Sequence, residues 1–457
     1  MASFDGYDKA KLGDKRLSRR LKRMLIQLAC CITVSISAAC KDPHQAKAAY
    51  RFIANDKVSV ASITEITHDV AMANIEAENP PVVLILQDTS EFNYTSLKAT
   101  EGLGNIGRRS AAMGVVVHTA MAVGEDGVVY GILSQKIWTR PPEEHSKSKL
   151  RKKLPIEEKE SFKWLEAIDS AGASFPEGTL SVHVSDRESD IYEYFCKAEK
   201  EGAHYLCRRF QNRNIDGDDA NKKLDGFVGA LPVAGKITVQ VPRDSHTGRK
   251  ARDAELEIKY GKCKIAKPSL LAGRKDLPGS VEVYVVSAVE VAPPPGVEGI
   301  SWQLVTNVPT ECFEDAVARI AWYAQRWKIE IFHRTLKSGC KVEELQSDSA
   351  EKLKKLIAIY SIVALETMDL SYLGRAHPDA SCEIRFTEEE WKILYRVANK
   401  TRELPDKVPT IQEAVIMVAK LGGFLGRKSD GYPGVTVIWR GLTSFYTILD
   451  AAQFLLT

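Results

Sequence analysis

The chain has 457 residues, of which 44% are hydrophobic and 27% charged, and its formal net charge is only +3. This is ordinary globular composition, and the length predicts roughly two to four domains. The nine cysteines form no C-x-x-C pair and no signal-peptide pattern opens the sequence, so disulfide-rich, zinc-binding and secreted classes are excluded and we expect a soluble cytoplasmic protein.

Residues 1–75 are expected to be helical, because apolar residues recur there at helical spacing from Leu17 to Leu28. Residues 1–60 carry twelve Lys and Arg against five Asp. A basic stripe of this kind is typical of surfaces that bind DNA phosphates, although for a basic run alone a solvated helix face is the commoner explanation. Most of the excess lies in Lys15, Arg16, Arg19, Arg20, Lys22 and Arg23.

Strands and helices alternate in the next part of the chain. The continuous apolar run 82–86 is typical of a buried central strand. A turn at Glu125-Asp126-Gly127 joins two further strands. We expect strands at 82–86, 113–123, 128–134 and 180–184, helices at 162–171 and 188–201, and an exposed charged segment at 147–160.

Residues 201–300 change character and predict a β-rich insertion, with strands at 236–241, 254–260 and 281–289. A strand at 302–307 and a long helix at 311–338 follow. The remainder is expected to be mainly helical. Its clearest signals are a capping box of Thr387 with Glu390 and a helix stop at Gly422-Gly423.

Two aspartates follow predicted strands. Asp88 comes just after 82–86 and Asp186 just after 180–184, and binding sites in open α/β sheets form at the carboxyl ends of strands. Carboxylates suit Mg²⁺, and two metal ions about 3.5–4 Å apart can activate an attacking oxygen and stabilise a leaving one. Taken singly, each has a simpler explanation: Asp88 can open a turn, and Asp186 can be a first-turn acid of a helix capped by Ser185.

The helix at 311–338 carries a polar stripe that favours the metal site. Four of its residues fall within about 60° of one another: Tyr323, Arg326, Glu330 and Lys337. The adjacent stripe, expected to pack on the sheet, is Ile320, Ala324, Trp327 and Ile331. An acid at the edge of a packing face can reach a metal, and the basic residues can hold phosphates. A surface ion pair of Arg326 with Glu330 is the alternative.

The spacing Tyr323-x2-Arg326-x3-Glu330-x6-Lys337 resembles the signature box of the insertion-sequence-four transposases, most closely those of the Tn-five type. Asp88 and Asp186 stand where that family places its first two catalytic acids. Shorter strings resemble other family motifs in the same order, so the resemblance covers nearly the whole chain; they lie at 12–16, 49–52, 160–164 and 421–424.

The resemblance implies an α/β fold: an RNase H-like mixed sheet flanked by helices and interrupted by the β-rich insertion. It implies a helical DNA-binding domain at 1–75 and a catalytic domain at 76–200 and 301–345. The insertion occupies 201–300, and a mainly helical dimerisation domain occupies 346–457.

The resemblance also implies a function: a cut-and-paste transposase that cleaves transposon ends through a DNA hairpin intermediate and joins the 3′ ends to target DNA. It would act as a homodimer in the bacterial cytoplasm, associated with the nucleoid. Asp88, Asp186 and Glu330 would bind two Mg²⁺ ions, for which Mn²⁺ can substitute. The residues expected to contact DNA are Tyr323, Arg326, Lys337, Trp302, Arg208, Arg209, Arg16, Arg19, Arg20, Arg23 and Arg51.

Some assignments stay open at this stage. Trp302 stands where the family has a tryptophan that stacks on a flipped base, but an ordinary core aromatic is an equal alternative. Arg213 lies close enough to Arg208 and Arg209 that we favour the group over one residue. Two other functions compete: a DNA-binding regulator without activity, and an RNase H-like nuclease without strand transfer.

Overall fold

The fold is taken from a computed structural model of the chain. It describes all residues except 1–3, 5, 8–11, 31–34, 41, 108–110, 142–153, 172–174, 218–222, 242–250, 428–429 and 457. Half of the charged segment expected at 147–160, residues 147–153, therefore lies outside the described residues.

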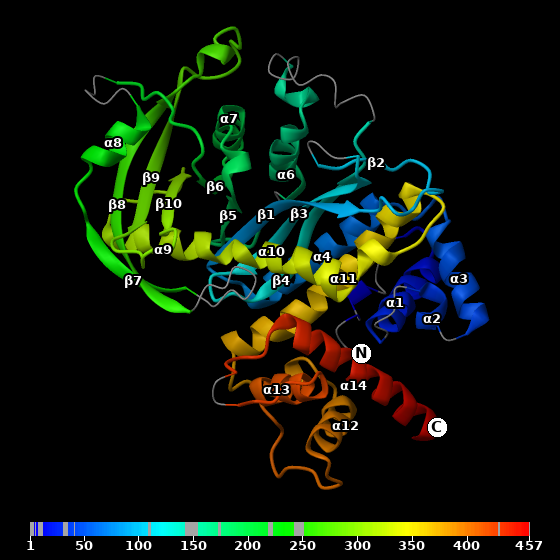
Figure 1. Cartoon of the computed structure of the whole chain (residues 1–457). Coiled ribbons are helices and arrows are strands. Elements are labelled where there is room, and N and C mark those ends of the chain that lie inside the picture. Colours follow the sequence, from blue (N-terminus) through cyan, green and yellow to red (C-terminus); the bar gives the residue numbers. More distant parts are fainter. Residues whose placement is uncertain are drawn as a thin grey trace.

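Helices dominate both ends of the chain, and strands dominate its middle (Figure 1). The helices are α1 (Lys15–Ala29), α2 (Ile36–Cys40), α3 (Pro43–Ile53), α4 (Val60–Glu78), α6 (Lys163–Ala171), α7 (Tyr192–Glu201), α8 (Leu224–Ala230), α9 (Phe313–Gln325), α10 (Trp327–Arg334), α11 (Ala350–Ala376), α12 (Glu388–Asn399), α13 (Ile411–Leu421) and α14 (Val435–Leu456). The strands are β1 (Val82–Asn93), β2 (Gly104–Asn105), β3 (Met113–Gly124), β4 (Val129–Trp138), β5 (Leu180–Ser185), β6 (His204–Arg208), β7 (Gly235–Val241), β8 (Arg252–Ala266), β9 (Ser280–Glu290) and β10 (Ser301–Thr306).

All ten strands belong to one mixed sheet in the order β2-β3-β1-β5-β6-β10-β9-β8-β7, with β4 also paired to β3. Strands β1, β5 and β6 run parallel to one another, whereas β3 is antiparallel to β1, and β10 to β6. Strand β6 thus lies in the middle of the sheet, although its residues fall within the segment predicted as an insertion. Short apolar strands such as Tyr205-Leu206-Cys207 give too little pattern for sequence to assign.

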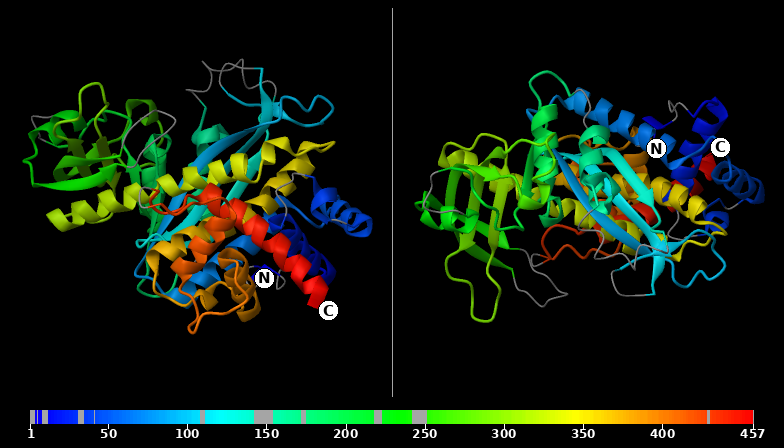
Figure 2. Two further views of the ribbon diagram at one scale, coloured as in Figure 1. Left: turned by 60° about the horizontal axis from the view of Figure 1, so that its bottom comes forward. Right: turned by 90° about the horizontal axis from the view of Figure 1, so that it is seen from above.

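Side chains of β1 alternate between two apolar layers, as the twofold period of a strand requires. Leu84 and Leu86 belong to the main core, which includes residues of α10 and α11, whereas Val83 and Ile85 belong to a smaller core with residues of α4 and α6. Helices α9 to α11 run along one side of the sheet, and α6 and α7 lie on the other (Figures 1 and 2). The central strands are therefore covered on both faces.

Two elements differ from the sequence prediction. Strand β1 continues through Asp88 to Asn93, because β3 pairs with it along that whole length, so Asp88 is within a strand and opens no turn. The helix expected at 311–338 is divided at Arg326 and ends in a π-helical turn, η7 (Thr335–Gly339). Each interruption changes the angular phase of the residues that follow it.

The expected packing stripe on this helix is consequently wrong in two of its four members. Ile320 is buried and Ile331 partly buried, but Ala324 is exposed and the Trp327 side chain is 53% exposed. The residues that pack on the core in its second half are Ile329, Phe332 and Leu336. Other local signals were correct: the turn between β3 and β4, the capping box of α12, and the end of α13 at Gly422.

The amino-terminal helices are attached to the body of the protein through the long helix α11. Leu21, Met24 and Leu28 of α1 are buried, as their spacing predicted. The ammonium group of Lys355, on α11, donates hydrogen bonds to the carbonyl oxygens of Ile53 and Asn55, each at 3.0 Å. These bonds satisfy carbonyls at the end of α3, where helix geometry leaves them without partners.

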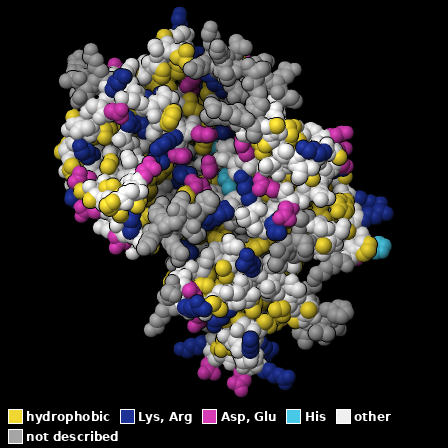
Figure 3. Space-filling view, in the orientation of Figure 1, with side chains coloured by type: hydrophobic (Ala, Val, Ile, Leu, Met, Phe, Trp, Pro, Cys, Tyr) yellow, Lys and Arg dark blue, Asp and Glu magenta, His cyan; other side chains and the backbone are white. Residues whose placement is uncertain are grey.

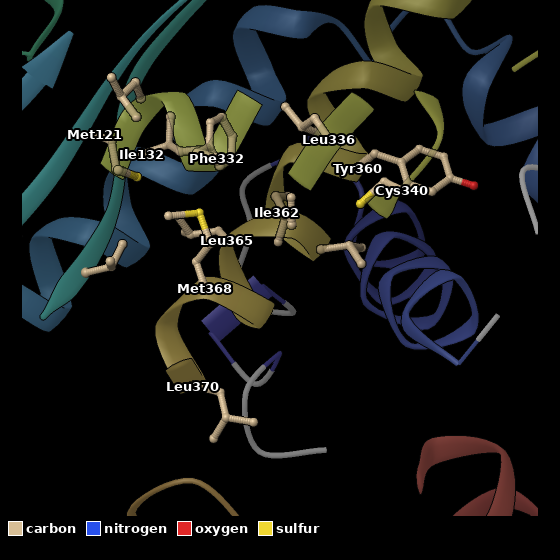
Figure 4. Packing of buried hydrophobic residues seen from close by; sticks show 14 of the residues in the cluster. Met121, Ile132, Phe332, Leu336, Cys340, Tyr360, Ile362, Leu365, Met368 and Leu370 are labelled. Carbon is tan, nitrogen blue, oxygen red and sulfur yellow. The ribbon is translucent and has the colours of Figure 1, made fainter. Parts of the chain in front are cut away.

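Helix α11 is the central element of the main core. Phe332, Leu336, Leu365 and Met368 belong to one cluster that joins α10 and the π-helical turn to α11 (Figure 4). Among the described residues, α11 is the one helix long and apolar enough to cross a bilayer, but 83% of its apolar window is buried inside the protein. Its composition is therefore explained by the core.

Two glycines allow α13 and α14 to approach closely. A Cβ added at Gly441 would lie 1.8 Å from the carbonyl oxygen of Val418, and one at Gly422 would lie 2.0 Å from that of Val437. Neither oxygen can move without shifting its own helix.

We predict that Gly441→Ala separates these helices and lowers the free energy of unfolding by about 1–3 kcal/mol. Gly434→Ala is the matched control, because no atom lies within 4 Å of a Cβ at that position. Urea unfolding followed by circular dichroism measures both. Equal stability of the two variants would contradict the close approach.

Candidate active site

The pairing of β1 with β5 brings the two aspartates together. The register is constant along the pair, with Val82 opposite Leu180 and Leu86 opposite Val184. Continued by two residues, the same register sets Asp88 beside Asp186. Because side chains two apart on a strand share a face, both carboxylates are directed to the same side of the sheet.

Glu330 reaches this side from α10, which packs against β1. Its carboxylate accepts a 2.6 Å hydrogen bond from Arg326 Nη2. The side chains are 11% exposed for Arg326 and 34% for Glu330, so the ion pair predicted as the alternative is present and partly buried. In the same orientation as Figure 1, acidic side chains gather near the centre of the molecule, with Lys and Arg around them (Figure 3).

The electrostatics of Asp88 report on the other two acids. The pKa of Asp88 is raised to about 6, mainly by burial; the Thr89 N–H and Arg326 lower it, and the charges of Glu330 and Asp186 raise it. Such repulsion requires proximity, since the effect of exposed charges is screened within about 10 Å. Asp186 and Glu330 thus both lie close enough to Asp88 to act on its pKa.

Tyr323 is part of the same site. Its hydroxyl donates a 3.1 Å hydrogen bond to Asp186 Oδ1, and burial raises the pKa of Tyr323 to about 12, so it remains a donor. The ring of Trp302 meets that of Tyr323 edge to face at 5.5 Å between centroids. Trp302 is partly buried against the core, and its contact with Tyr323 places it beside the acids.

His333 is a member of the site that the sequence did not single out. Its Nδ1 lies 3.9 Å from Asp88 Oδ2, and the ring is almost fully buried. Burial, with added repulsion from Lys337, lowers the pKa of His333 to about 3, so the ring is neutral. Its place three residues after Glu330 on the same helix was the available signal. Lys337 itself lies over the ring of Phe92, at 5.1 Å.

Lys328 was also missed, because its spacing resembles that of any solvated lysine. It is buried on the side of α10 away from Glu330, and its ammonium group donates a 3.0 Å hydrogen bond to the carbonyl of Gly127. It also lies over the Tyr372 ring, at 4.5 Å. Burial lowers its pKa to about 8. Lys328 therefore fastens α10 to the turn between β3 and β4.

Of the other predicted DNA contacts, Arg208 lies near the acids, because its charge acts on Tyr323 and the β5–β6 register, continued by one residue, sets it beside Asp186. Arg208 donates to the Ser301 carbonyl at 3.0 Å, and Arg209 pairs with Asp225. Arg213 is buried in an ion pair with Asp190, which links two parts of the fold. Among the arginines of the amino-terminal helices predicted to contact DNA, the exposed ones are Arg16, Arg19, Arg23 and Arg51, while Arg20 is partly buried and donates to Gln45.

The alternative capping role of Ser185 is not what the structure shows. The Ser185 hydroxyl bonds that of Ser189, and α7 begins only at Tyr192 after a short 3-10 turn. Within the described part of the chain, no three His, Cys, Asp or Glu side chains are grouped closely enough to hold a metal ion as they stand. The bond from Arg326 to Glu330 engages one of the three acids.

Comparison with known families identifies both ends of the chain. Residues 5–58 match the family model for transposase DNA-binding, and residues 362–456 match the one for the Tn5 transposase dimerisation domain. These matches support a Tn5-type transposase. They also support DNA as a partner and a homodimer as the assembly. Asp88, Asp186 and Glu330 fall between the two matched regions.

The raised pKa of Asp88 makes a prediction about stability. An unfolded aspartate has a pKa of about 3.9, so ionising Asp88 costs the folded state free energy. This destabilisation is absent below about pH 4, grows as the pH rises from 4 to 6, and is complete above about pH 6. Asp88→Asn, which has the same shape without the charge, should raise the free energy of unfolding at pH 8 by on the order of 1–2 kcal/mol.

The gain should shrink at pH 4.5, and urea unfolding without divalent ions at both pH values measures it. Asp406→Asn, at an exposed position in the loop before α13, is the control and should show no gain at either pH. A gain from Asp88→Asn that did not depend on pH would contradict the electrostatic origin.

Proposed function

We propose that this chain is a cut-and-paste DNA transposase of the insertion-sequence-four family. It binds the ends of its transposon, cleaves them through a DNA hairpin intermediate and joins the 3′ ends to target DNA. The chemistry takes place at Asp88, Asp186 and Glu330. The division into DNA-binding, catalytic, inserted and dimerisation domains is part of the proposal.

The observation that carries the proposal is the convergence of the three acids. They are separated by about a hundred residues and more along the chain, yet the β1–β5 register aligns two of them, and the charges of Asp186 and Glu330 both act on the pKa of Asp88. An acid cluster of no function would be costly to maintain, because buried like charges destabilise a fold. Perturbed carboxylates of this kind are typical of functional sites.

An RNase H-like catalytic domain is supported by the order of the central strands. Strands β4, β3 and β1 form an antiparallel meander, and β5 and β6 continue from β1 in parallel. Strand β10 and the three strands beyond it extend this arrangement, which fits an insertion built onto the sheet edge. Asp88 lies within β1, and Asp186 directly follows the adjacent strand β5 at the centre of the sheet.

The residues present fit Mg²⁺. Three carboxylates form a hard oxygen donor set, and their mutual repulsion favours a cation among them. Asp88, Asp186 and Glu330 would hold the metal, with Glu330 exchanging its bond to Arg326 for one to the ion. Bound there, a metal pair would activate the attacking oxygen and stabilise the leaving oxygen of phosphoryl transfer.

The neighbouring side chains orient the acids and the DNA. The Tyr323 hydroxyl holds one oxygen of Asp186 and leaves the other free to face a ligand. Arg326, released from Glu330, offers its guanidinium to a DNA phosphate, and Lys337 at the end of the helix provides a second cation. The exposed arginines of α1 and α3 bind the transposon end, and α14 contributes to the dimer contact.

One observation favours a second candidate, a DNA-binding regulator without activity. Arg326 donates a short, partly buried hydrogen bond to the Glu330 carboxylate, which gives this acid a partner in the absence of metal. The two candidates differ in one assay. Cleavage of DNA carrying the terminal inverted repeats, with Mg²⁺, is expected of the transposase, and binding without nicking is expected of the regulator. Cutting without end specificity or strand transfer would indicate a nuclease.

We predict that Asp88→Ala, Asp186→Ala and Glu330→Ala each reduce end cleavage to background while binding to end DNA is unchanged. The reason is that the acids hold metal, whereas the amino-terminal basic residues hold DNA. Gel-shift and single-turnover cleavage assays measure the two activities, with Asp406→Ala as the control. Normal nicking and joining by all three variants would refute the assignment.

We also predict that the double variant Arg19→Gln, Arg23→Gln weakens binding to end DNA and lowers its salt dependence. Removal of one bond to a DNA phosphate reduces the slope of log K against log salt concentration by about 0.9. Fluorescence anisotropy over a salt series gives the slope. Arg402→Gln, an exposed position in the loop before α13, serves as the control, and an unchanged slope in the double variant would place the DNA elsewhere.

A further inference from the structure

The segment 160–164 resembles a family motif, yet none of its residues belongs to the proposed catalytic set. It forms a 3-10 turn, η4 (Glu160–Phe162), and the first residues of α6. Lys163 and Trp164 are buried, with side-chain exposure of only 5% for Lys163. Because the Lys163 side chain is buried, it cannot contact a DNA phosphate, and its position in the fold requires another explanation.

One set of contacts leads from this segment to the strand of Asp88. Glu160 accepts two hydrogen bonds from Arg140, at 2.6 and 2.8 Å. The same guanidinium pairs with Glu91, three residues beyond Asp88 on β1. The carboxylate of Glu91 also accepts a hydrogen bond from the N–H of Gly107. The end of β1 is therefore tied to the start of η4.

A second set leads to the turn that carries Asp186. The ammonium group of Lys163 lies 3.4 Å from Glu188 Oε2 and 3.8 Å from Glu160 Oε1. Glu188 is two residues after Asp186, within the 3-10 turn η5 (Arg187–Ser189). The ammonium group of Lys163 thus lies between Glu160, which is linked to β1 through Arg140, and Glu188, which lies on the turn that follows Asp186.

A third set of contacts leads from Trp164 to Asp88. The Trp164 ring meets His118 edge to face, with centroids 4.6 Å apart. His118 Nδ1 lies 2.9 Å from the hydroxyl of Thr89, and the N–H of Thr89 donates to Asp88 Oδ1 at 2.8 Å. A displacement of Trp164 would therefore shift His118 and Thr89, and with them the backbone N–H that binds the Asp88 carboxylate.

We propose that Lys163 and Trp164 are positioning residues that hold the strand of Asp88 and the turn of Asp186 in one fixed relation, so that the two carboxylates can share divalent ions. This inference rests on the proposed function. Neither residue touches DNA or the reacting atoms; both act through Glu188, His118 and Thr89. Residues that support metal ligands in this way change metal affinity or activity by about 10–100-fold when altered.

The test uses the full chain with Lys163→Met, which keeps the length of the side chain and removes the charge. Lys163→Arg retains the charge as the conservative variant, and Trp164→Phe tests the second contact independently. Lys197→Met is the matched control: Lys197 also bridges two acids, Asp169 of α6 and Glu201 of α7, but away from the catalytic acids.

Three quantities are measured for each variant: Mn²⁺ binding by electron paramagnetic resonance, the Kd for end DNA, and the melting temperature. We expect Lys163→Met and Trp164→Phe to weaken Mn²⁺ binding by about 10-fold or more. The Kd for DNA should be unchanged, Lys163→Arg should recover most of the Mn²⁺ affinity, and Lys197→Met should bind Mn²⁺ like the unaltered protein.

The outcomes separate this inference from the proposed function. If the unaltered protein binds Mn²⁺ and cleaves ends, but Lys163→Met and Trp164→Phe bind Mn²⁺ equally well and lose only thermal stability, then the segment is merely structural and the inference is overturned. If the unaltered protein neither binds Mn²⁺ nor cleaves, the proposed function fails first, and the positioning role fails with it.

Discussion

The parallel pairing of β1 with β5 is the constraint on which the site depends. Apolar residues on both faces of these strands fix their register, because a slip of one residue would turn every buried side chain to the wrong layer. The same register forces Asp88 and Asp186 to be neighbours. The free energy gained by burying these apolar side chains therefore outweighs the electrostatic repulsion between the two aspartates. In the proposed function, this loss of stability accompanies the capacity to bind a cation.

The position of Glu330 depends on an interruption in the helix that carries it. The 3-10 turn at Arg326 sets the phase of α10, and Lys328 holds that helix to the turn between β3 and β4. With this phase, Glu330 lies close enough to Asp88 to act on its pKa, and Trp327 is exposed to solvent. Irregular turns within helices often mark functional segments. Here the irregular turn allows the helix to pack on the sheet while its polar residues remain near the aspartates.

Sequence was sufficient for whatever is encoded locally. The apolar run of β1, the turn at Gly127 and the capping box at Thr387 each contain their own signal. The three acids were predicted from their place after expected strands and from a family box, although Asp88 lies within β1 and not at its end. Long-range contacts carry no such signal. His333 is buried beside Asp88, and Lys328 lies beneath an aromatic ring, because elements distant in the chain close over them. The exposure of Trp327 and the internal position of β6 depend on helix phase and on strand pairing, which composition does not determine.

Helix α11 extends over 27 residues, or about 40 Å, and its two ends serve different parts of the molecule. Near its start, Lys355 closes the end of α3; its second half enters the region matched as a dimerisation domain. One helix therefore contacts the region matched as DNA-binding and contributes to the region matched as a dimerisation domain. In the proposed function, the separation between bound DNA and the dimer contact would be set largely by the length of α11.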